Sequence, residues 1–233
     1  METLVIIGHP DSANSHSQQF LLQTGQALTE VDYFDLGRYY KEYGEFKSEL
    51  ELERLANYSR IILQFQLYWY QAPFLLKMWI DQVFHEDIDY RKVKSIIKDK
   101  ELGFVVVTGS KGSKYQAEYG HGVTISELLS PYHAFANYWQ MRRLPYFPIH
   151  EFHLKAKEDQ WQLMIDYVTY LESGKVDSFQ ALQETVLSKL PKVKMNKLEE
   201  NVNQSMEFQL FIQTLEQQAD QLSQIYHLNQ EDF

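Results

Sequence analysis

The sequence predicts an α/β protein in which a doubly wound, parallel, five-stranded sheet is covered by helices on both faces. Short apolar runs without polar alternation are typical of parallel strands buried on both sides. Segments with helical spacing of apolar residues separate these runs, and the alternation of strand and helix continues through residue 173. The remaining chain has no strand-like run. We therefore expect a sheet domain at residues 1–174 and a helical C-terminal extension at residues 175–233.

Five segments are the expected strands. Three runs rich in Val, Ile, Leu and Phe are the clearest, at Leu4–Ile7, Arg60–Phe65 and Leu102–Thr108. Val31–Leu36, second in chain order, has a weaker pattern. Tyr146–Ile149 follows one proline and contains another, so it fits only an edge strand, where a missing N–H interrupts no ladder. In such sheets the ligand sits beyond the carboxyl ends of the strands.

Four segments have helical spacing of apolar side chains: Ser17–Thr29, Pro73–Phe84, Val123–Tyr138 and Lys155–Ser173. Gly25 weakens the first pattern because glycine is a poor helix former. A proline in the first turn suits the start of the second helix, since that position needs no N–H. A proline inside the third segment predicts a bend there.

The extension contains ten Gln, one Pro and two amphipathic patterns. The first predicts a short helix that ends at Pro191, and the second has apolar residues at alternating steps of four and three, as in a heptad seam. Such a helix packs either on its own domain or on a partner subunit, and both alternatives stay open. The apolar positions are Phe179, Leu182, Val186 and Leu190 in the first pattern and Phe208, Ile212, Leu215, Ala219, Leu222 and Tyr226 in the second.

Composition and charge exclude several classes of function. The 233 residues carry a formal net charge of −10, which disfavours sequence-independent nucleic-acid binding because that binding depends on neutralising phosphates. The absence of cysteine excludes disulfides, thiolate metal sites and a cysteine nucleophile. No signal peptide and no membrane span is visible, so we expect a cytoplasmic protein. The spacing of His85, His150 and His153 matches no metal motif, and we interpret them as surface or packing residues.

The loop after the first strand is a candidate phosphate site. Gly8-His9-Pro10 is followed by a hydroxyl-rich stretch that leads into a helix. The free N–H groups and the dipole of a helix N-terminus favour an anion, and Ser15 and Ser17 add hydroxyl donors. Plain capping of the helix by these serines is the alternative. The sequence has neither a P-loop lysine nor a G-x-G-x-x-G motif, which excludes those two nucleotide motifs.

Two further loops follow the third and fourth expected strands. One contains Tyr68, Trp69 and Tyr70, which are unfavourable to expose and should border a pocket or a subunit contact. The other is glycine-rich between Thr108 and Gly122, which allows close backbone approach to a flat ligand. An aromatic core cluster and a mobile surface loop are the respective alternatives. Together the three loops would supply a phosphate site, an aromatic wall and hydrogen-bond donors, which are the needs of a flavin mononucleotide.

Three motifs in these loops resemble those of the flavodoxin-like NAD(P)H:quinone oxidoreductases. They are HPxxxxS from His9, LYWYxxPxLLKxWxDxVF from Leu67 and TGSxGSxYxxxxxHG from Thr108, and the second is the most specific. The family includes the DT-diaphorases and the flavoprotein ancillary subunits of bacterial potassium efflux, and the resemblance covers roughly residues 1–173. It implies a flavodoxin-like fold, bound FMN or FAD, NAD(P)H as the donor, a quinone-like acceptor and a homodimer. The implied reaction is a ping-pong transfer of hydride.

The resemblance also implies roles for individual residues. The implied cofactor site has three parts, which hold the phosphate and ribityl chain, the isoalloxazine ring, and the pyrimidine edge of that ring. A tyrosine and a histidine form a catalytic pair that stabilises charge during hydride transfer. The residues are His9, Ser15 and Ser17 for the phosphate; Leu67, Tyr68, Trp69 and Tyr70, through their backbone, for the ring; Thr108, Gly109, Ser110 and Gly112 for the pyrimidine edge; and Tyr115 and His121 for catalysis.

Three positions depart from the family pattern: Gln18 stands where many members have Asn, Gln66 replaces a Pro, and Ser110 replaces a second Gly. The extension has no counterpart in the shorter bacterial members. A second function therefore stays open beside the enzyme, namely a regulatory or ancillary subunit that acts by docking on a partner protein. The heptad-like pattern favours docking, whereas the spacing of Tyr115 and His121 favours catalysis.

Overall fold

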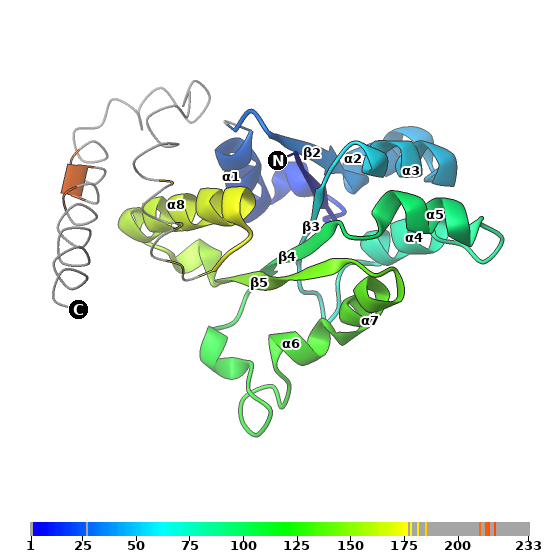
Figure 1. The fold of residues 1–233 in the computed structure, drawn as a ribbon. Coiled ribbons are helices and arrows are strands. Elements are labelled where there is room, and N and C mark those ends of the chain that lie inside the picture. Colours follow the sequence, from blue (N-terminus) through cyan, green and yellow to red (C-terminus); the bar gives the residue numbers. More distant parts are fainter. Residues whose placement is uncertain are drawn as a thin grey trace, which may run out of the picture.

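The computed structural model describes residues 2–26 and 28–176, together with the single positions 178, 181, 185, 210, 213, 214 and 217. At its centre is a parallel five-stranded sheet with the order β2-β1-β3-β4-β5 (Figure 1). The predicted strands and their parallel arrangement are confirmed. The strand order reverses between β1 and β3, which is where doubly wound sheets bind ligands. The strands are β1 (Thr3–Ile7), β2 (Val31–Asp35), β3 (Arg60–Gln66), β4 (Glu101–Thr108) and β5 (Arg142–His150).

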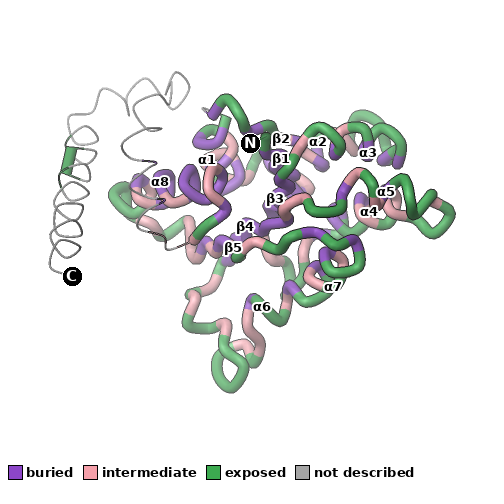
Figure 2. The backbone as a smooth tube through the Cα atoms, in the orientation of Figure 1, coloured by how far each residue is buried: buried purple, intermediate pink, exposed green. Residues whose placement is uncertain are grey.

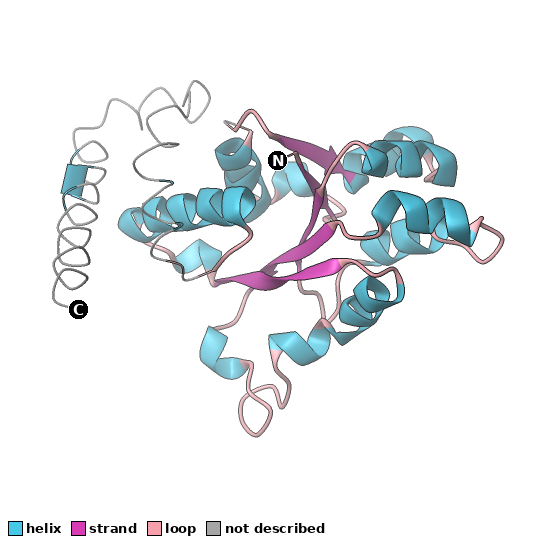
Figure 3. Cartoon of the chain, viewed as in Figure 1, coloured by secondary structure: helices cyan, strands magenta, loops and turns pink. Residues whose placement is uncertain are grey.

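Helices cover both faces of the sheet, as Figure 3 shows. Two of them lie on one face and the others on the opposite face, each against its own apolar core. The first face carries α1 (His16–Gly25) and α8 (Lys157–Ser173); the second carries α2 (Leu36–Tyr43), α3 (Ser48–Ala56), α4 (Phe74–Val83), α5 (Tyr90–Ile97), α6 (Ile125–Leu128) and α7 (Ser130–Tyr138).

The strands are buried between these two cores (Figure 2). In β1, Leu4 and Ile6 pack on the side of α3 and α4, whereas Val5 and Ile7 pack on the side of α1 and α8. Full burial of one such side chain contributes about 1.5–3 kcal/mol relative to leaving it in water. An entirely apolar strand is therefore favoured only where helices cover both sides, which explains the absence of alternation in the sequence.

The edge strand β5 is longer than predicted. It begins at Arg142, four residues before the predicted start at Tyr146, and it includes Pro145 and Pro148. It lies at the edge of the sheet, beside β4. One side of an edge strand has no ladder hydrogen bonds, so the two prolines are tolerated there.

The predicted helix Val123–Tyr138 is two helices, α6 and α7. Thr124 starts α6 with a capping box, and Pro131 stands in the first turn of α7, where no N–H is needed. Pro73 is the N-cap of α4 rather than a first-turn residue, and α1 ends at Gly25 instead of continuing to Thr29. The helices α2, α3 and α5 are not among the predicted ones.

The two amphipathic patterns predicted for the extension lie outside the described residues, except for the single positions given above. Of these positions, Ala181 and Thr185 are buried and Leu210 is exposed. Within the part of the chain that the structure describes, no helix combines the length and apolar character that a membrane span needs.

Candidate functional site

His9 joins the first loop to the second. It is buried just beyond β1, and its Nδ1 accepts a hydrogen bond of 3.0 Å from the backbone N–H of Asp11. A neutral imidazole carries one proton, so Nε2 holds it and donates to the hydroxyl of Tyr68 at 2.7 Å. Burial lowers the pKa of His9, with Asp11 opposing the change, and this favours the neutral ring.

The N-terminus of α1 has the features of an anion site. Ser15 is the N-cap, and its hydroxyl accepts from the N–H of Gln18 over a long contact of 3.5 Å. Ser17 Oγ lies 3.3 Å from Ser15 Oγ. Gln18 is fully buried, yet its Nε2 has no hydrogen-bond partner. A buried donor without an acceptor costs about 1–3 kcal/mol. An anionic ligand would remove that cost, and the helix dipole also favours it.

The second loop is a tight turn with an unusual sequence. The N–H groups of Tyr68 and Gln71 donate to each other's carbonyl oxygens at 2.9 and 3.1 Å. Between them, Trp69 and Tyr70 have φ angles of 49° and 66°. Two positive φ angles are typical of a type I′ turn, which usually contains Asn-Gly. The left-handed conformation costs roughly 1–2 kcal/mol for a residue other than glycine, and such strain clusters at ligand sites.

This turn leaves two backbone donors for a ligand. The N–H of Leu67 donates to the carbonyl of Val107 at 2.9 Å, and the N–H of Tyr68 is used within the turn. The N–H groups of Trp69 and Tyr70 make no hydrogen bond among the described residues. Of the four residues predicted to line a ring through their backbone, these two therefore have free donors. The Trp69 side chain is 91% exposed, which is unfavourable unless a ligand or another chain covers it.

Tyr70, Tyr115 and His121 form an aromatic group where the second and third loops meet. Tyr70 Oη lies 3.2 Å from His121 Nδ1, and the ring centroids of Tyr115 and His121 are 5.0 Å apart. The buried Nε2 of His121 has no partner among the described residues. Burial raises the pKa of Tyr115, and hydrogen bonding with the Thr108 and Ser110 side chains partly opposes that change. The Tyr115 phenol therefore keeps its proton at neutral pH.

Glycine shapes the third loop at two positions. Gly120 has a φ of 65°, and a Cβ there would lie 2.4 Å from the carbonyl oxygen of Lys114. Only glycine fits this turn. The turn reverses the chain, so that His121 lies beside Tyr115. At Gly109, by contrast, a Cβ would meet nothing within 4 Å. The backbone of Gly109 therefore borders open space that a flat ligand could enter.

On the sequence alone we interpret His150 as a surface or packing residue, and the structure places it beside the third loop. It ends β5 directly opposite Thr108 of β4. The Thr108 hydroxyl donates to the carbonyl of Ser110 at 2.8 Å, so His150 Nδ1, also 2.8 Å from that hydroxyl, must be the donor to it. Burial lowers the pKa of His150 and favours its neutral form. A Cβ on Gly112 would lie 2.9 Å from its ring. His150 thus packs beneath the third loop.

Hydrogen bonds connect all these parts in series. They join the first loop to the second, the second to the third, and the third to the end of β5. The loops therefore converge at the carboxyl edge of the sheet, as the strand order leads us to expect. The functional roles of the individual residues remain predictions.

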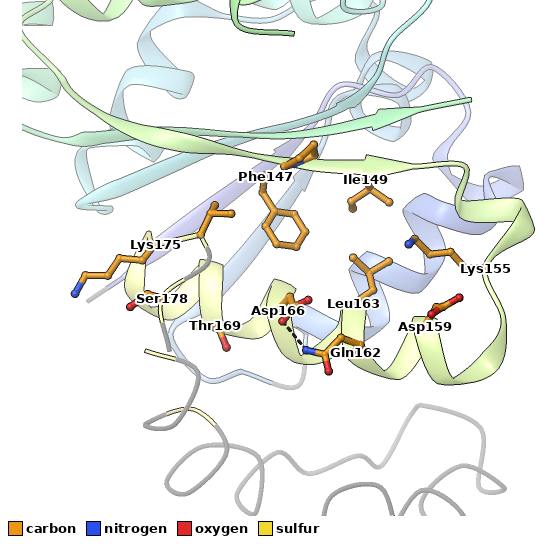
Figure 4. A pocket seen from close by; sticks show the side chains of 12 residues that line it. Phe147, Ile149, Lys155, Asp159, Gln162, Leu163, Asp166, Thr169, Lys175 and Ser178 are labelled. Atoms are coloured by element: carbon orange, nitrogen blue, oxygen red, sulfur yellow. Dashed lines mark hydrogen bonds between the residues drawn. The ribbon is translucent and has the colours of Figure 1, made fainter. Parts of the chain in front are cut away.

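A cavity of about 630 Å³ lies elsewhere, between β5 and α8 (Figure 4). Phe147 from β5 and Leu163 from α8 line it, and at its rim Gln162 donates to Asp166 at 2.8 Å. The predicted site residues are not part of its lining. The cavity is therefore separate from the converging loops. Within the described ranges, no group of three or more His, Asp or Glu residues could hold a metal ion.

Comparison with known proteins places the chain among proteins of one fold. The model of a family described by its flavodoxin-like fold matches residues 1–171. The uncharacterized NAD(P)H oxidoreductase YrkL of Bacillus subtilis (strain 168) is 34% identical over 173 residues, which are 72% of this chain and 98% of that protein. The family match ends within α8, so the extension lies outside it.

Two solved structures share the fold. The structure of an NADPH-quinone reductase from P. pentosaceus is 36% identical, with a TM-score of 0.64 over 73% of this chain and 98% of that one. General stress protein 14 of Treponema denticola, solved in complex with FMN, is 24% identical, with a TM-score of 0.68 over 75% of this chain and 100% of that one. At that identity the second likeness shows the fold alone.

Proposed function

This chain belongs to the flavodoxin-like family that contains these NAD(P)H oxidoreductases and quinone reductases, and we propose that it is a flavin enzyme that reduces quinone-like electrophiles. A bound flavin would supply the chemistry, which is to take up hydride from NADH or NADPH and to pass two electrons to the acceptor in a separate step. The names of the relatives support this donor and this acceptor. The proposed donor also fits the cytoplasmic location that the sequence predicts.

One observation carries the proposal. Among the described residues, two buried side-chain nitrogen atoms lack a hydrogen-bond partner, Gln18 Nε2 and His121 Nε2. Buried polar groups are normally paired, so each exception needs an explanation. Gln18 lies in the first turn of α1, which follows the first loop, and His121 lies in the third loop beside the strained aromatic turn. A ligand with an anionic end and a polar ring edge would pair both.

Different residues would contact different parts of the proposed flavin. Ser15, Ser17 and Gln18 would hold its phosphate at the start of α1, with His9 supporting the wall of the second loop through Tyr68. The free N–H groups of the aromatic turn would meet the polar edge of the ring. The open backbone at Gly109 would lie against its pyrimidine end. The single helix N-terminus suits one phosphate, and the Treponema denticola complex contains FMN, so we propose FMN rather than FAD.

Tyr115 and His121 are the proposed proton donors. If the hydroxyl of Tyr70 donates to His121 Nδ1, the proton of a neutral His121 ring is held on Nε2, the atom without a partner. A quinone oxygen gains negative charge as it is reduced, and a donor at that position stabilises it. Tyr115 keeps its phenol proton at neutral pH because burial raises its pKa, so it can donate to the same charge.

We also propose a homodimer. The resemblance implies one, and large aromatic side chains are exposed beside the site. Trp69 is 91% and Phe74 is 62% exposed. Exposed aromatic groups of this size favour contact with another surface. A second copy of the chain is the partner that the resemblance implies.

The test of the proposed function is flavin uptake followed by reduction. Purified protein is saturated with FMN or FAD, separated from free flavin and denatured, and the released fluorescence is measured. The bound protein is then mixed without oxygen with NADH or NADPH and afterwards with a benzoquinone. We expect release of FMN, bleaching by at least one nucleotide and reoxidation by the quinone. Wild-type protein that takes up no flavin contradicts the proposal. Bound flavin that neither nucleotide reduces would favour the docking function instead.

A pair of threonine variants controls for general damage. Thr108 and Thr169 are both buried, but only Thr108 lies in the proposed site, whereas the Thr169 hydroxyl donates to Ile165 within α8. Thr108→Val should weaken flavin binding because it removes the hydroxyl between His150 and Ser110. Thr169→Val should leave flavin binding unchanged.

A further inference from the structure

A row of buried polar side chains crosses the core between the sheet and the helices α1 and α8. Tyr33 Oη of β2 lies 2.8 Å from Tyr167 Oη of α8, and the Tyr167 hydroxyl donates to Gln64 Oε1 of β3 at 2.6 Å. Gln64 Nε2 then donates to Gln18 Oε1 of α1 at 2.8 Å. Gln18, Gln64 and Tyr167 are 0% exposed. Four elements thus contribute one polar group each to an otherwise apolar region.

Counting the hydroxyl and amide protons shows which group donates each hydrogen bond in this row. Each phenol has one proton, and that of Tyr167 is used on Gln64, so the contact between the two hydroxyls uses the proton of Tyr33. Burial raises the pKa of both tyrosines and keeps them protonated. Every donor therefore points toward Gln18, whose own Nε2 ends the row without an acceptor. Hydrogen bonds in such a chain polarise one another, which strengthens the last donor.

The opposite direction is also consistent with the proton count. If both amides and both phenols turned round, Tyr33 would donate to the carbonyl of Leu21, which lies 3.3 Å from its hydroxyl. The row would then end on an oxygen of Gln18. An anion at the N-terminus of α1 opposes that arrangement, because it needs a donor there. A bound phosphate would therefore select the direction that the structure shows.

Gly25 makes room for the first donor of the row. A Cβ at position 25 would lie 1.7 Å from Tyr33 Oη. Glycine destabilises a helix interior, and Gly25 is the last residue of α1. Its presence there is explained by the Tyr33 hydroxyl, which occupies the space that a larger side chain would need.

We propose that Tyr33, Tyr167 and Gln64 are positioning residues, which hold the amide of Gln18 as a donor toward the phosphate of the bound flavin nucleotide. Gln18 stands at the third position of α1, and the hydroxyls of Ser15 and Ser17 lie at the same helix start. The inference rests on the proposed flavin site and adds a link between that site and α8. Without the Tyr167 hydroxyl, nothing fixes Gln64 Oε1, and the Gln18 amide is free to turn its oxygen toward the phosphate.

The experiment compares FMN with riboflavin, which lacks the phosphate. Dissociation constants of both are measured by flavin fluorescence with wild-type protein and with Gln18→Leu, Tyr33→Phe and Tyr167→Phe. Hydrogen bonds to charged groups are the strong ones, so Gln18→Leu should weaken FMN binding about 10- to 100-fold. The two tyrosine variants act through Gln18 and should weaken it about three- to tenfold. Riboflavin affinity should change by less than about twofold in all three, because it makes no phosphate contact.

Tyr170→Phe is the matched control. Tyr170 is also fully buried on α8, but its hydroxyl accepts from the N–H of Phe104 at 3.1 Å and donates to the carbonyl of Pro145 at 2.7 Å. Its loss should lower thermal stability without changing the ratio of the FMN and riboflavin constants. In a Gln18→Leu background, Tyr167→Phe should have no further effect on that ratio, because the two residues act through one donor.

The outcomes separate the two proposals. Wild-type protein that binds neither flavin overturns the proposed function and this inference together. If the protein binds both flavins and Tyr167→Phe leaves the ratio of their dissociation constants unchanged, the inference alone is overturned. An equal loss of affinity for FMN and riboflavin has the same consequence. If Tyr167→Phe does not fold, Tyr33→Phe decides, since Tyr33 is only partly buried.

Discussion

At the scale of single residues, the proposed chemistry depends on Tyr115 and His121. General acid assistance is typically worth about 10²–10⁴-fold in rate. Water can replace a donor in an open site, so Tyr115→Phe and His121→Gln should each slow flavin reduction or quinone turnover roughly tenfold. Stopped-flow mixing with NADH and NADPH measures the first step, and mixing of reduced protein with a quinone measures the second. Flavin occupancy should stay unchanged.

A tyrosine on the same loop provides the control for this pair. Tyr119 is 71% exposed and makes none of the contacts described above. Tyr119→Phe should therefore have wild-type rates. Equal rates in wild type, Tyr115→Phe and His121→Gln, with flavin bound in all of them, would remove both residues from the mechanism.

His150 should support the third loop through its Nδ1 proton. His150→Asn keeps a donor near the Nδ1 position, whereas His150→Phe keeps a ring but removes the donor to Thr108. A lost neutral hydrogen bond is worth about 1 kcal/mol, so the Phe variant should bind flavin roughly fivefold more weakly and the Asn variant nearly as well as wild type. Flavin titration measures both constants. Equal affinities for the two variants would show that His150 acts only as packing.

His9 and His150 should also make the free energy of unfolding depend on pH. Burial lowers the pKa of His9 and His150 in the folded protein, below the ordinary value of 6.5. As the pH falls through about 6.5, the unfolded chain binds more protons than the folded one, so the free energy of unfolding decreases. The decrease stops below the lowered, folded-state pKa. Urea unfolding between pH 5 and 8 should show this slope in wild type and a smaller slope in His150→Asn.

At the scale of elements, capping residues mark two of the three helices that the sequence pattern failed to predict, α2 and α5. Asp35 caps α2, which ends at Gly44 with a φ of 76°, and Asp89 caps α5 by accepting from two backbone N–H groups. These cap residues are visible in the sequence. Each helix has eight residues and buries only two of them, so the apolar spacing that identified α1, α4 and α8 is nearly absent. The capping residues were the better signal there.

The parallel arrangement of the strands follows from the sequence more readily than their register does. The alternation of strands and helices was enough to predict three converging loops, because parallel strands share one carboxyl edge. The place of His150 was not predictable, since it depends on the β4–β5 register that pairs it with Thr108. The aromatic turn was predicted as a wall but not as a type I′ turn, because Trp69-Tyr70 lacks the usual Asn-Gly signal. Long-range pairing and strained backbone are tertiary properties that local patterns do not encode.

At the scale of the whole molecule, the alternation of strands and helices that builds the sheet is complete at α8. Among the described residues, the buried members of both apolar cores lie between Leu4 and Leu171, and the partly buried Val176 packs against one of these cores. The buried Arg60, at the amino end of β3, donates to the carbonyl of Leu171 at 2.5 Å and to Glu101 at 2.7 Å. These bonds fix the end of α8 to the amino edge of the sheet, and Gly174 ends the helix in a left-handed conformation. The extension therefore departs from the edge opposite the candidate site.

We propose that the extension strengthens the dimer and takes no part in flavin binding. Light scattering of the full chain should give a dimer, twice the chain mass of 27.7 kDa. Deletion of residues 192–233 should leave flavin affinity and the thermal transition of the sheet domain near wild type, because the alternation of strands and helices that builds the sheet is complete at α8. The dimer of the truncated protein should dissociate at a higher protein concentration than the dimer of the full chain.

Leu215→Lys, in the predicted heptad seam, should weaken the dimer in the same way, whereas Gln217→Lys, at an exposed position, should not. A truncated chain that dimerises as tightly as the full one would show that the extension adds nothing to the dimer, which would then depend on the exposed aromatic residues beside the site, such as Trp69.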